Sequence, residues 1–138
     1  MYRKNRGFTL LELLVVLVIL GLLASLVGPQ VLKQVGSSKG KAAALQIQEF
    51  GTALDLFKLE VGRYPTSQEG LEALISKPSN ARFWNGPYLK KKIVRDDPWG
   101  NAYVYRAPGD HGEYDLYSLG ADGREGGEGD DSDVVSWE

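Results

Sequence analysis

An apolar run from Phe8 to Gly28 constrains this chain more than any other feature of its sequence. Only Thr9, Glu12 and Ser25 carry polar side chains within it. At about 1.5 Å rise per residue, a helix of this length can cross a hydrocarbon core of about 30 Å. The run therefore predicts a helix that spans a membrane once.

The residues before the run indicate its orientation. Arg3, Lys4 and Arg6 precede it, and the positive-inside rule places such a stub on the cytoplasmic side. A cleaved secretory signal fits less well, because the run exceeds the usual apolar region of about 7–15 residues. Residues 24–26, the best cleavage candidate, also end in leucine. We therefore expect a single membrane span with the basic stub on the cytoplasmic side, and a plain membrane anchor is the simplest interpretation of this run.

A plain anchor leaves Glu12 unexplained. A carboxylate inside a bilayer costs a few kcal/mol or more and marks a functional position by default. No Lys, Arg or His lies between Phe8 and Gln30, so the partner of Glu12 must come from another molecule or from processing. Cleavage after Gly7 would expose an ammonium group at Phe8, about one helical turn from Glu12.

Residues 7–12, Gly-Phe-Thr-Leu-Leu-Glu, resemble the site that prepilin peptidase cleaves in type IV pilins and type II secretion pseudopilins. The resemblance implies that residues 1–7 are a leader peptide, cleaved between Gly7 and Phe8. It also implies N-methylation of Phe8. Glu12 would then pair with the N-terminal ammonium of a neighbouring subunit during assembly.

The helical pattern continues beyond the membrane run. Pro29 would remove a backbone hydrogen bond and clash with the preceding turn, so we expect a kink or local melting near Gly28–Pro29. The alternative is that the helix ends there. Residues 42–60 resume helical spacing with one apolar stripe, which predicts a face packed on a core. That stripe contains Ala43, Ile47, Phe50, Leu54 and Phe57. The resemblance favours one stem helix over residues 29–62.

Residues 63–138 predict a small globular head. Gly62 and Pro65 end the stem helix, and Thr66 with Glu69 forms a capping box before a short helix. Residues 102–107 and 113–118 predict two strands joined by a turn at 108–112. The grouping of elements predicts the fold class α+β, with a long N-terminal helix, a short helix, a small antiparallel sheet and a C-terminal acidic loop. The resemblance implies that this is the type IV pilin-like fold.

Lys90, Lys91 and Lys92 form the one dense basic patch after the leader. Three lysines make a footprint too narrow for nucleic acid, so no nucleic-acid partner is expected. A solvated strand edge is the simplest interpretation of this patch. Contact with an acidic partner subunit is the alternative.

Three further motifs extend the resemblance to nearly the whole chain. Residues 63–66 (Arg-Tyr-Pro-Thr), 97–100 (Asp-Pro-Trp-Gly) and 117–120 (Tyr-Ser-Leu-Gly) resemble landmarks of the major pseudopilins of type II secretion systems. Pilins of surface fibres commonly close a C-terminal loop with a cysteine pair, and this chain contains no cysteine. The resemblance therefore favours a pseudopilin over a surface pilin.

The stretch from 119 to 133 is rich in glycine and acidic residues. Composition alone indicates a solvated loop, but Val134, Val135 and Trp137 follow it and predict that the chain end packs back on the head. Carboxylates held together repel one another, and calcium would stabilise them with its oxygen shell of about 6–8 ligands. The spacing of an EF-hand is absent, so the residues alone leave a plain acidic loop open. With no cluster of His or Cys, zinc is disfavoured.

The resemblance favours calcium in this loop. The ligands that it implies are the Leu119 carbonyl and the side chains of Asp122, Asp131 and Asp133, with Ser132 or a nearby carbonyl completing the shell. The register between Asp130 and Asp131 stays open. Glu125 and Glu128 are expected outside the shell.

No residues suggest catalysis. His111 is the single histidine and lies in a predicted turn, and neither a nucleophile motif nor a phosphate-binding loop is present. The resemblance implies a structural subunit held by a single span in the bacterial inner membrane, surrounded by lipid, with its head in the periplasm. This subunit would then polymerise into a helical filament, the periplasmic pseudopilus that drives export of folded proteins. The implied partners are prepilin peptidase, minor pseudopilins and the inner-membrane assembly platform. A type IV pilin of a surface fibre and a monomeric, membrane-anchored calcium-binding module are the alternatives.

Overall fold

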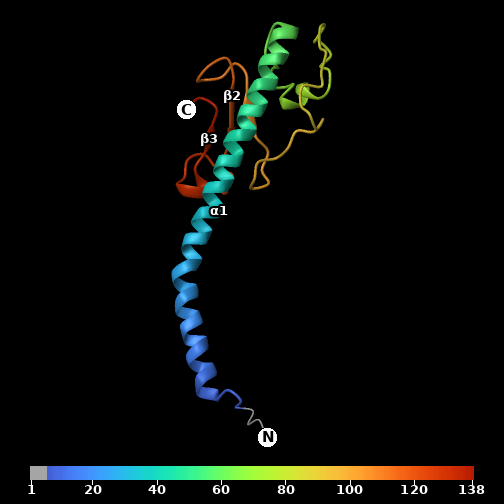
Figure 1. The fold of residues 1–138 in the computed structure, drawn as a ribbon. Helices are drawn as coiled ribbons and strands as arrows, with labels where there is room; N and C mark the ends of the chain where they lie inside the picture. The colour runs from blue at the N-terminus through green and yellow to red at the C-terminus, as the bar shows by residue number, and fades with distance from the viewer. Residues whose placement is uncertain (1–5) are drawn as a thin grey trace, which may run out of the picture. The chain divides into compact units, whose positions relative to one another are not determined.

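A computed structural model describes residues 6–138 of the chain. The long helix α1 (Leu10–Val61) comes first, followed by the short 3₁₀ helix η1 (Leu71–Leu74). The strands β1 (Val104–Arg106), β2 (Asp115–Ser118) and β3 (Val134–Val135) follow, with the 3₁₀ turn η2 (Gly129–Asp131) between β2 and β3 (Figure 1). The chain divides into two compact units, one ending at Val35 and one running from Gly36 to Glu138. The α+β fold expected from the sequence is confirmed.

Helix α1 runs through Gly28 and Pro29 without a break. The alternative that the membrane helix ends at this proline is therefore wrong. Local melting is not found either, because the backbone is helical at both residues. The predicted kink stays a prediction.

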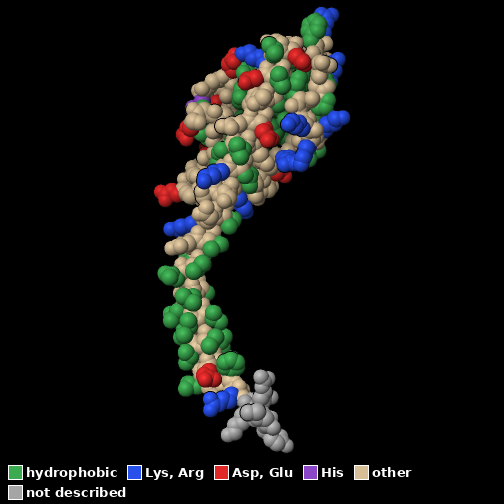
Figure 2. Space-filling model, in the orientation of Figure 1, with side chains coloured by type: hydrophobic (Ala, Val, Ile, Leu, Met, Phe, Trp, Pro, Cys, Tyr) green, Lys and Arg blue, Asp and Glu red, His purple; other side chains and the backbone are tan. Residues whose placement is uncertain are grey.

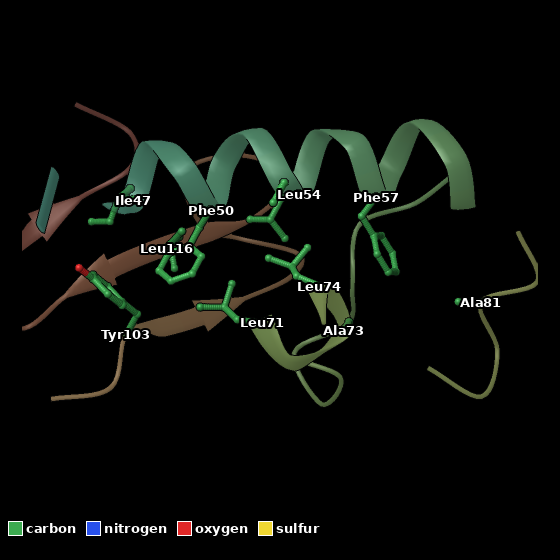
Figure 3. Packing of buried hydrophobic residues seen from close by; sticks show 11 residues of the cluster. Ile47, Phe50, Leu54, Phe57, Leu71, Ala73, Leu74, Ala81, Tyr103 and Leu116 are labelled. Atoms are coloured by element: carbon green, nitrogen blue, oxygen red, sulfur yellow. The ribbon is translucent and has the colours of Figure 1, made fainter. Parts of the chain in front are cut away.

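The core of the unit Gly36–Glu138 is built on the apolar stripe of α1. Phe57 and Leu54 are fully buried there, and the stripe packs on η1 and β2 (Figure 3). The buried cluster consists of Ile47, Phe50, Ala53, Leu54, Phe57, Leu71, Ala73, Leu74, Ala81, Tyr103 and Leu116. The predicted core face is thus confirmed, and this unit carries a hydrophobic core of its own.

Helix α1 ends, and the next turn begins, with the capping interactions that the sequence predicts. The Gly62 N–H donates to the Lys58 carbonyl at 2.8 Å, and its φ of 89° suits glycine. The Thr66 N–H donates to Glu69 Oε2 (2.9 Å) and the Glu69 N–H to Thr66 Oγ1 (3.2 Å), so the capping box is confirmed. It caps a single turn, after which η1 forms. Two hydrogen bonds from Arg63 hold the pKa of Glu69 below its usual value.

The sheet has the order β1-β2-β3 and is antiparallel throughout. Tyr117 pairs with Val104 on one side and with Val135 on the other. The two predicted strands are confirmed in shorter form, and the predicted return of the chain end is confirmed as β3. Trp137 then stacks on the His111 ring with centroids 3.9 Å apart, so the residue before the last is pinned to the β1–β2 turn.

Lys90, Lys91 and Lys92 are exposed but do not lie on a strand. The predicted strand edge is wrong, because these residues form turns and bends, and Lys92 has a φ of 45°, which extended backbone does not allow. The two aromatic residues in the preceding loop, Phe83 and Trp84, differ in their contacts. Trp84 donates its indole N–H to the Ala73 carbonyl (2.8 Å), whereas Phe83 is exposed.

Candidate functional sites: the N-terminal segment and the acidic loop

The N-terminal part of α1 exposes apolar side chains all around its axis. Every residue from Phe8 to Val35 is exposed, and hydrophobic side chains cover the visible face of this segment (Figure 2). Within residues 6–138, α1 is the one helix long and apolar enough to cross a membrane, judged by length and composition. Exposed apolar surface of this extent marks contact with lipid or with other proteins.

Glu12 caps its own helix. The Thr9 N–H donates to Glu12 Oε2 (2.9 Å), and the Glu12 N–H donates to Thr9 Oγ1 (3.2 Å). This reciprocal pair is a capping box, and its signal in the sequence is the spacing Thr-x-x-Glu at residues 9–12, which overlaps the processing motif. The structure thus assigns Glu12 a local role beside the predicted docking role.

Gly7 and Phe8 lie just before α1, outside the helix, and both are exposed. Their peptide bond is therefore not part of regular structure. Arg3 and Lys4 of the predicted leader lie outside the described residues. Cleavage between Gly7 and Phe8 and methylation of Phe8 stay predictions.

The two ends of the acidic loop, residues 119–133, meet at a narrow neck formed by residues 120–121 and 130–132. The Ala121 N–H donates to the Asp130 carbonyl at 2.8 Å. Gly120 has a φ of 73°, and a Cβ there would lie 2.8 Å from the Ser132 carbonyl oxygen and 2.9 Å from that of Asp130. Only glycine fits this position, because both the backbone conformation and the space exclude a side chain.

The predicted calcium ligands mostly contact their own loop. Asp122 Oδ1 accepts from the Arg124 N–H (3.0 Å), Asp133 Oδ2 accepts from the Gly126 N–H (3.1 Å), and the Ser132 hydroxyl donates to the Gly129 carbonyl (2.7 Å). Asp131 is exposed. Among residues 6–138, no three Asp, Glu, His or Cys side chains gather closely enough to hold a metal ion. Asp122, Asp131 and Asp133 are therefore on one loop but not assembled around one point.

One atom of the loop is nevertheless suited to a cation. Asp133 Oδ1 is buried and is the one buried side-chain oxygen or nitrogen in the described part of the chain without a hydrogen-bond partner. A buried, unpartnered carboxylate oxygen is costly unless a positive charge meets it. With the Asp130 and Ser132 carbonyls nearby in the chain, this oxygen fits the hard, all-oxygen shell of calcium. The calcium site itself stays a prediction.

A buried polar cluster at the neck was not predicted. Asp97 is 4% exposed and accepts from the Ser118 hydroxyl at 2.6 Å. The Ser118 oxygen in turn accepts from the Gly120 N–H (3.1 Å), and the Asn101 side chain donates to the Gly120 carbonyl (3.2 Å). The two motifs that form it, Asp-Pro-Trp-Gly and Tyr-Ser-Leu-Gly, are visible in the sequence, but no local pattern shows that they meet in the fold.

Two known protein families match this chain, one over its N-terminal segment and one over the remainder. Residues 30–137 match the family described as "Type II secretion system (T2SS), protein G". Residues 2–28 match the "Prokaryotic N-terminal methylation motif".

Individual relatives are similar in both sequence and fold. The chain is 50% identical to the type II secretion system core protein G of Pseudomonas aeruginosa, over 99% of this chain and 97% of the relative. It is 47% identical to that of Vibrio cholerae, over 98% and 93%. The crystal structure of the major pseudopilin from the type 2 secretion system of enterohaemorrhagic Escherichia coli superposes with a TM-score of 0.63 and 30% identity, covering 73% of this chain and 88% of that one.

Proposed function

This chain belongs to the type II secretion system protein G family, and we propose that it is the structural subunit of a pseudopilus that drives protein export by type II secretion. The observation that carries this proposal is the exposed apolar helix. From Phe8 to Val35 every side chain is exposed, and most of them are aliphatic. Such a surface is stable in lipid or against other apolar helices, so it suits a subunit that leaves the membrane by packing its stem against neighbouring stems.

The subunit would be made as a precursor with a single membrane span, the basic stub in the cytoplasm and the head in the periplasm. The methylation motif over residues 2–28 supports cleavage between Gly7 and Phe8 by a prepilin peptidase. The new ammonium at Phe8 would then stand beside Glu12. Because Glu12 uses Oε2 in its own capping box, the other carboxylate oxygen would be available to the ammonium of a neighbouring subunit.

Homopolymerisation is the central partner interaction in this proposal. Minor pseudopilins and the inner-membrane assembly platform complete the set of protein partners. A catalytic role is not proposed. The single histidine, His111, contacts Asp115 Oδ2 at 3.1 Å and stacks on Trp137, an arrangement that serves the fold.

Calcium would stabilise the head by binding in the acidic loop. Asp133 supplies the buried oxygen that lacks a partner. The Leu119 carbonyl, Asp122, Asp131 and Ser132 are the further proposed ligands. When bound, the ion would neutralise carboxylates that otherwise repel one another along this loop.

The docking role of Glu12 can be separated from its capping role by two variants. Glu12→Ala removes both, whereas Thr9→Ala removes only the Thr9 Oγ1 acceptor of the capping box and leaves the Glu12 carboxylate in place. If docking dominates, Glu12→Ala abolishes filaments and secretion while membrane insertion persists, and Thr9→Ala retains assembly. Filament yield by shearing, secretion of an exported protein and membrane fractionation give the three readouts. Normal filaments from Glu12→Ala would exclude the docking role, and equal defects in both variants would assign the effect to capping.

Calcium binding is tested on the same chain by thermal unfolding with calcium and with excess chelator. A ligand that binds only the folded state stabilises it by about 2.7 kcal/mol at a hundredfold excess over its Kd. We expect a shift of this order that is lost in Asp133→Asn. An unchanged melting temperature would leave the stretch 119–133 as a plain acidic loop.

A further inference from the structure

We propose that Asp97 is a positioning residue for the calcium site: it orients the Leu119–Gly120 peptide through Ser118 and so aims the Leu119 carbonyl into the loop. This inference rests on the proposed calcium binding. Asp97 would not touch the ion. It lies in the turn before β1, about twenty residues before the loop in the sequence.

The two oxygens of Asp97 have different partners. Oδ1 accepts from the backbone N–H groups of Trp99 (3.1 Å) and Asn101 (2.8 Å), and the Asp97 N–H donates to the Asn101 carbonyl at 2.7 Å. These bonds close the local turn, and an ordinary turn would need nothing more. Oδ2 makes a contact outside the turn, because it accepts from the Ser118 hydroxyl at 2.6 Å.

That contact fixes the direction of the Ser118 hydroxyl. A hydroxyl has one hydrogen, and here it points at a carboxylate, so the serine oxygen can only accept from other groups. It accepts from the Gly120 N–H at 3.1 Å. Ser118 is fully buried, so water does not compete for either bond.

The Gly120 N–H and the Leu119 carbonyl belong to one planar peptide unit. In a trans peptide these two groups point in opposite directions, so holding the N–H against Ser118 also sets the direction of the Leu119 carbonyl. Asn101 holds the next unit, since its side chain donates to the Gly120 carbonyl at 3.2 Å. The turn at residues 97–101 therefore controls the orientation of the peptides on both sides of Gly120.

The same glycine contacts the returning side of the loop. A Cβ on Gly120 would lie 2.8 Å from the Ser132 carbonyl oxygen, and Asp133 follows directly with its unpartnered buried oxygen. Rotation of the Leu119–Gly120 peptide would thus disturb both sides of the neck. Partners that orient metal ligands typically change metal affinity by about 10–100-fold when they are removed.

The experiment measures calcium affinity of the full-length chain in detergent micelles by titration calorimetry. Asp97→Asn should raise the Kd for calcium about 10–100-fold, because the amide can donate to the serine oxygen and no longer fixes the hydroxyl. Ser118→Ala removes the link itself and should act in the same range. Asp96→Asn is the matched control: it makes the same charge change at an exposed neighbour and should leave the Kd unchanged.

Two further readouts separate positioning from loss of fold. The double variant Asp97→Asn/Ser118→Ala should bind calcium no more weakly than the weaker single variant, because both changes break one chain of contacts. In calcium-free buffer, amide exchange of the core helix should stay at the wild-type rate, while the Gly120 and Ala121 amides exchange faster. Equal calcium affinity in wild type, Asp97→Asn and Ser118→Ala would overturn the positioning role and leave calcium binding standing.

Absence of calcium binding in the wild-type chain would be a different failure. It would overturn the calcium proposal and, with it, the idea that Asp97 aims a ligand. Faster exchange at Gly120 in Asp97→Asn would then still support the narrower statement that Asp97 holds the neck. Unchanged exchange would overturn that statement too.

Discussion

The apolar stripe of α1 makes a quantitative prediction, because the helix carries a matched pair of leucines. Leu54 is 0% exposed and Leu59 is 80% exposed, five residues apart on the same helix. The substitution Leu54→Ala and its control Leu59→Ala delete the same atoms with the same change in helix propensity. Any difference between them therefore measures burial in the core.

The expected difference is large. Removal of a fully buried leucine side chain costs about 2–5 kcal/mol, from lost transfer free energy and from the cavity left behind. Leu59 has only about a fifth of its surface to lose, which at about 25 cal/mol per Å² amounts to roughly 0.5 kcal/mol or less. A domain of this size has a free energy of unfolding of about 5–15 kcal/mol, so Leu54→Ala should remove a substantial fraction of it.

Urea unfolding of the fragment 36–138, followed by tryptophan fluorescence, provides the assay. This fragment contains the whole buried cluster, and as a monomer it keeps filament contacts out of the measurement. The midpoint should fall strongly for Leu54→Ala and little for Leu59→Ala, with the slope unchanged in both. Equal losses in the two variants would refute the assignment of this stripe as the core face.

Three further predictions concern the head. The Arg63 guanidinium lowers the pKa of Glu69 from its ordinary 4.5, so the pair stabilises the folded head above that pH and the stabilisation is lost as the pH falls through the lowered pKa. Glu69→Gln should therefore flatten this part of an acid-unfolding titration. Gly120→Ala should destabilise the head by about 1–3 kcal/mol in urea, more than Gly126→Ala, because both glycines have positive φ but only Gly120 is crowded. Trp84→Phe should cost about 1–3 kcal/mol in the same assay by leaving the Ala73 carbonyl without its donor, and wild-type stability would contradict that.

The features that follow from local sequence were predictable. Helical spacing gave the core stripe, and the Thr-x-x-Glu pattern with the flanking Gly and Pro gave the end of α1 and the turn after it. Two segments rich in Tyr and Val with a turn between them gave β1 and β2. Each depends on interactions within a few residues, so a single sequence contains the needed information.

The features that depend on distant residues were missed or only partly predicted. Lys90–Lys92 looked like a strand edge because two β-branched residues follow, but within residues 6–138 the strands β1, β2 and β3 pair with one another and none pairs with this segment. The link from Asp97 to Ser118 joins residues 21 positions apart, and no local pattern encodes it. Glu12 is different again. Its capping partner Thr9 stands at the correct spacing in the sequence, but the same two residues also belong to the processing motif, so the pattern supports two interpretations.

The pairing of β2 with β3 makes the whole acidic stretch a single long hairpin connection. The entropy of closing such a connection grows only with the logarithm of its length, and doubling the length costs about 0.6 kcal/mol. Residues 124–129 are exposed, so added chain there would displace nothing from the core. Insertions at this tip that keep the Gly126 contact to Asp133 and the Gly129 contact to Ser132 should therefore be nearly neutral over evolution, so that lineages can vary the length and charge of the loop while the neck at Gly120 stays constant.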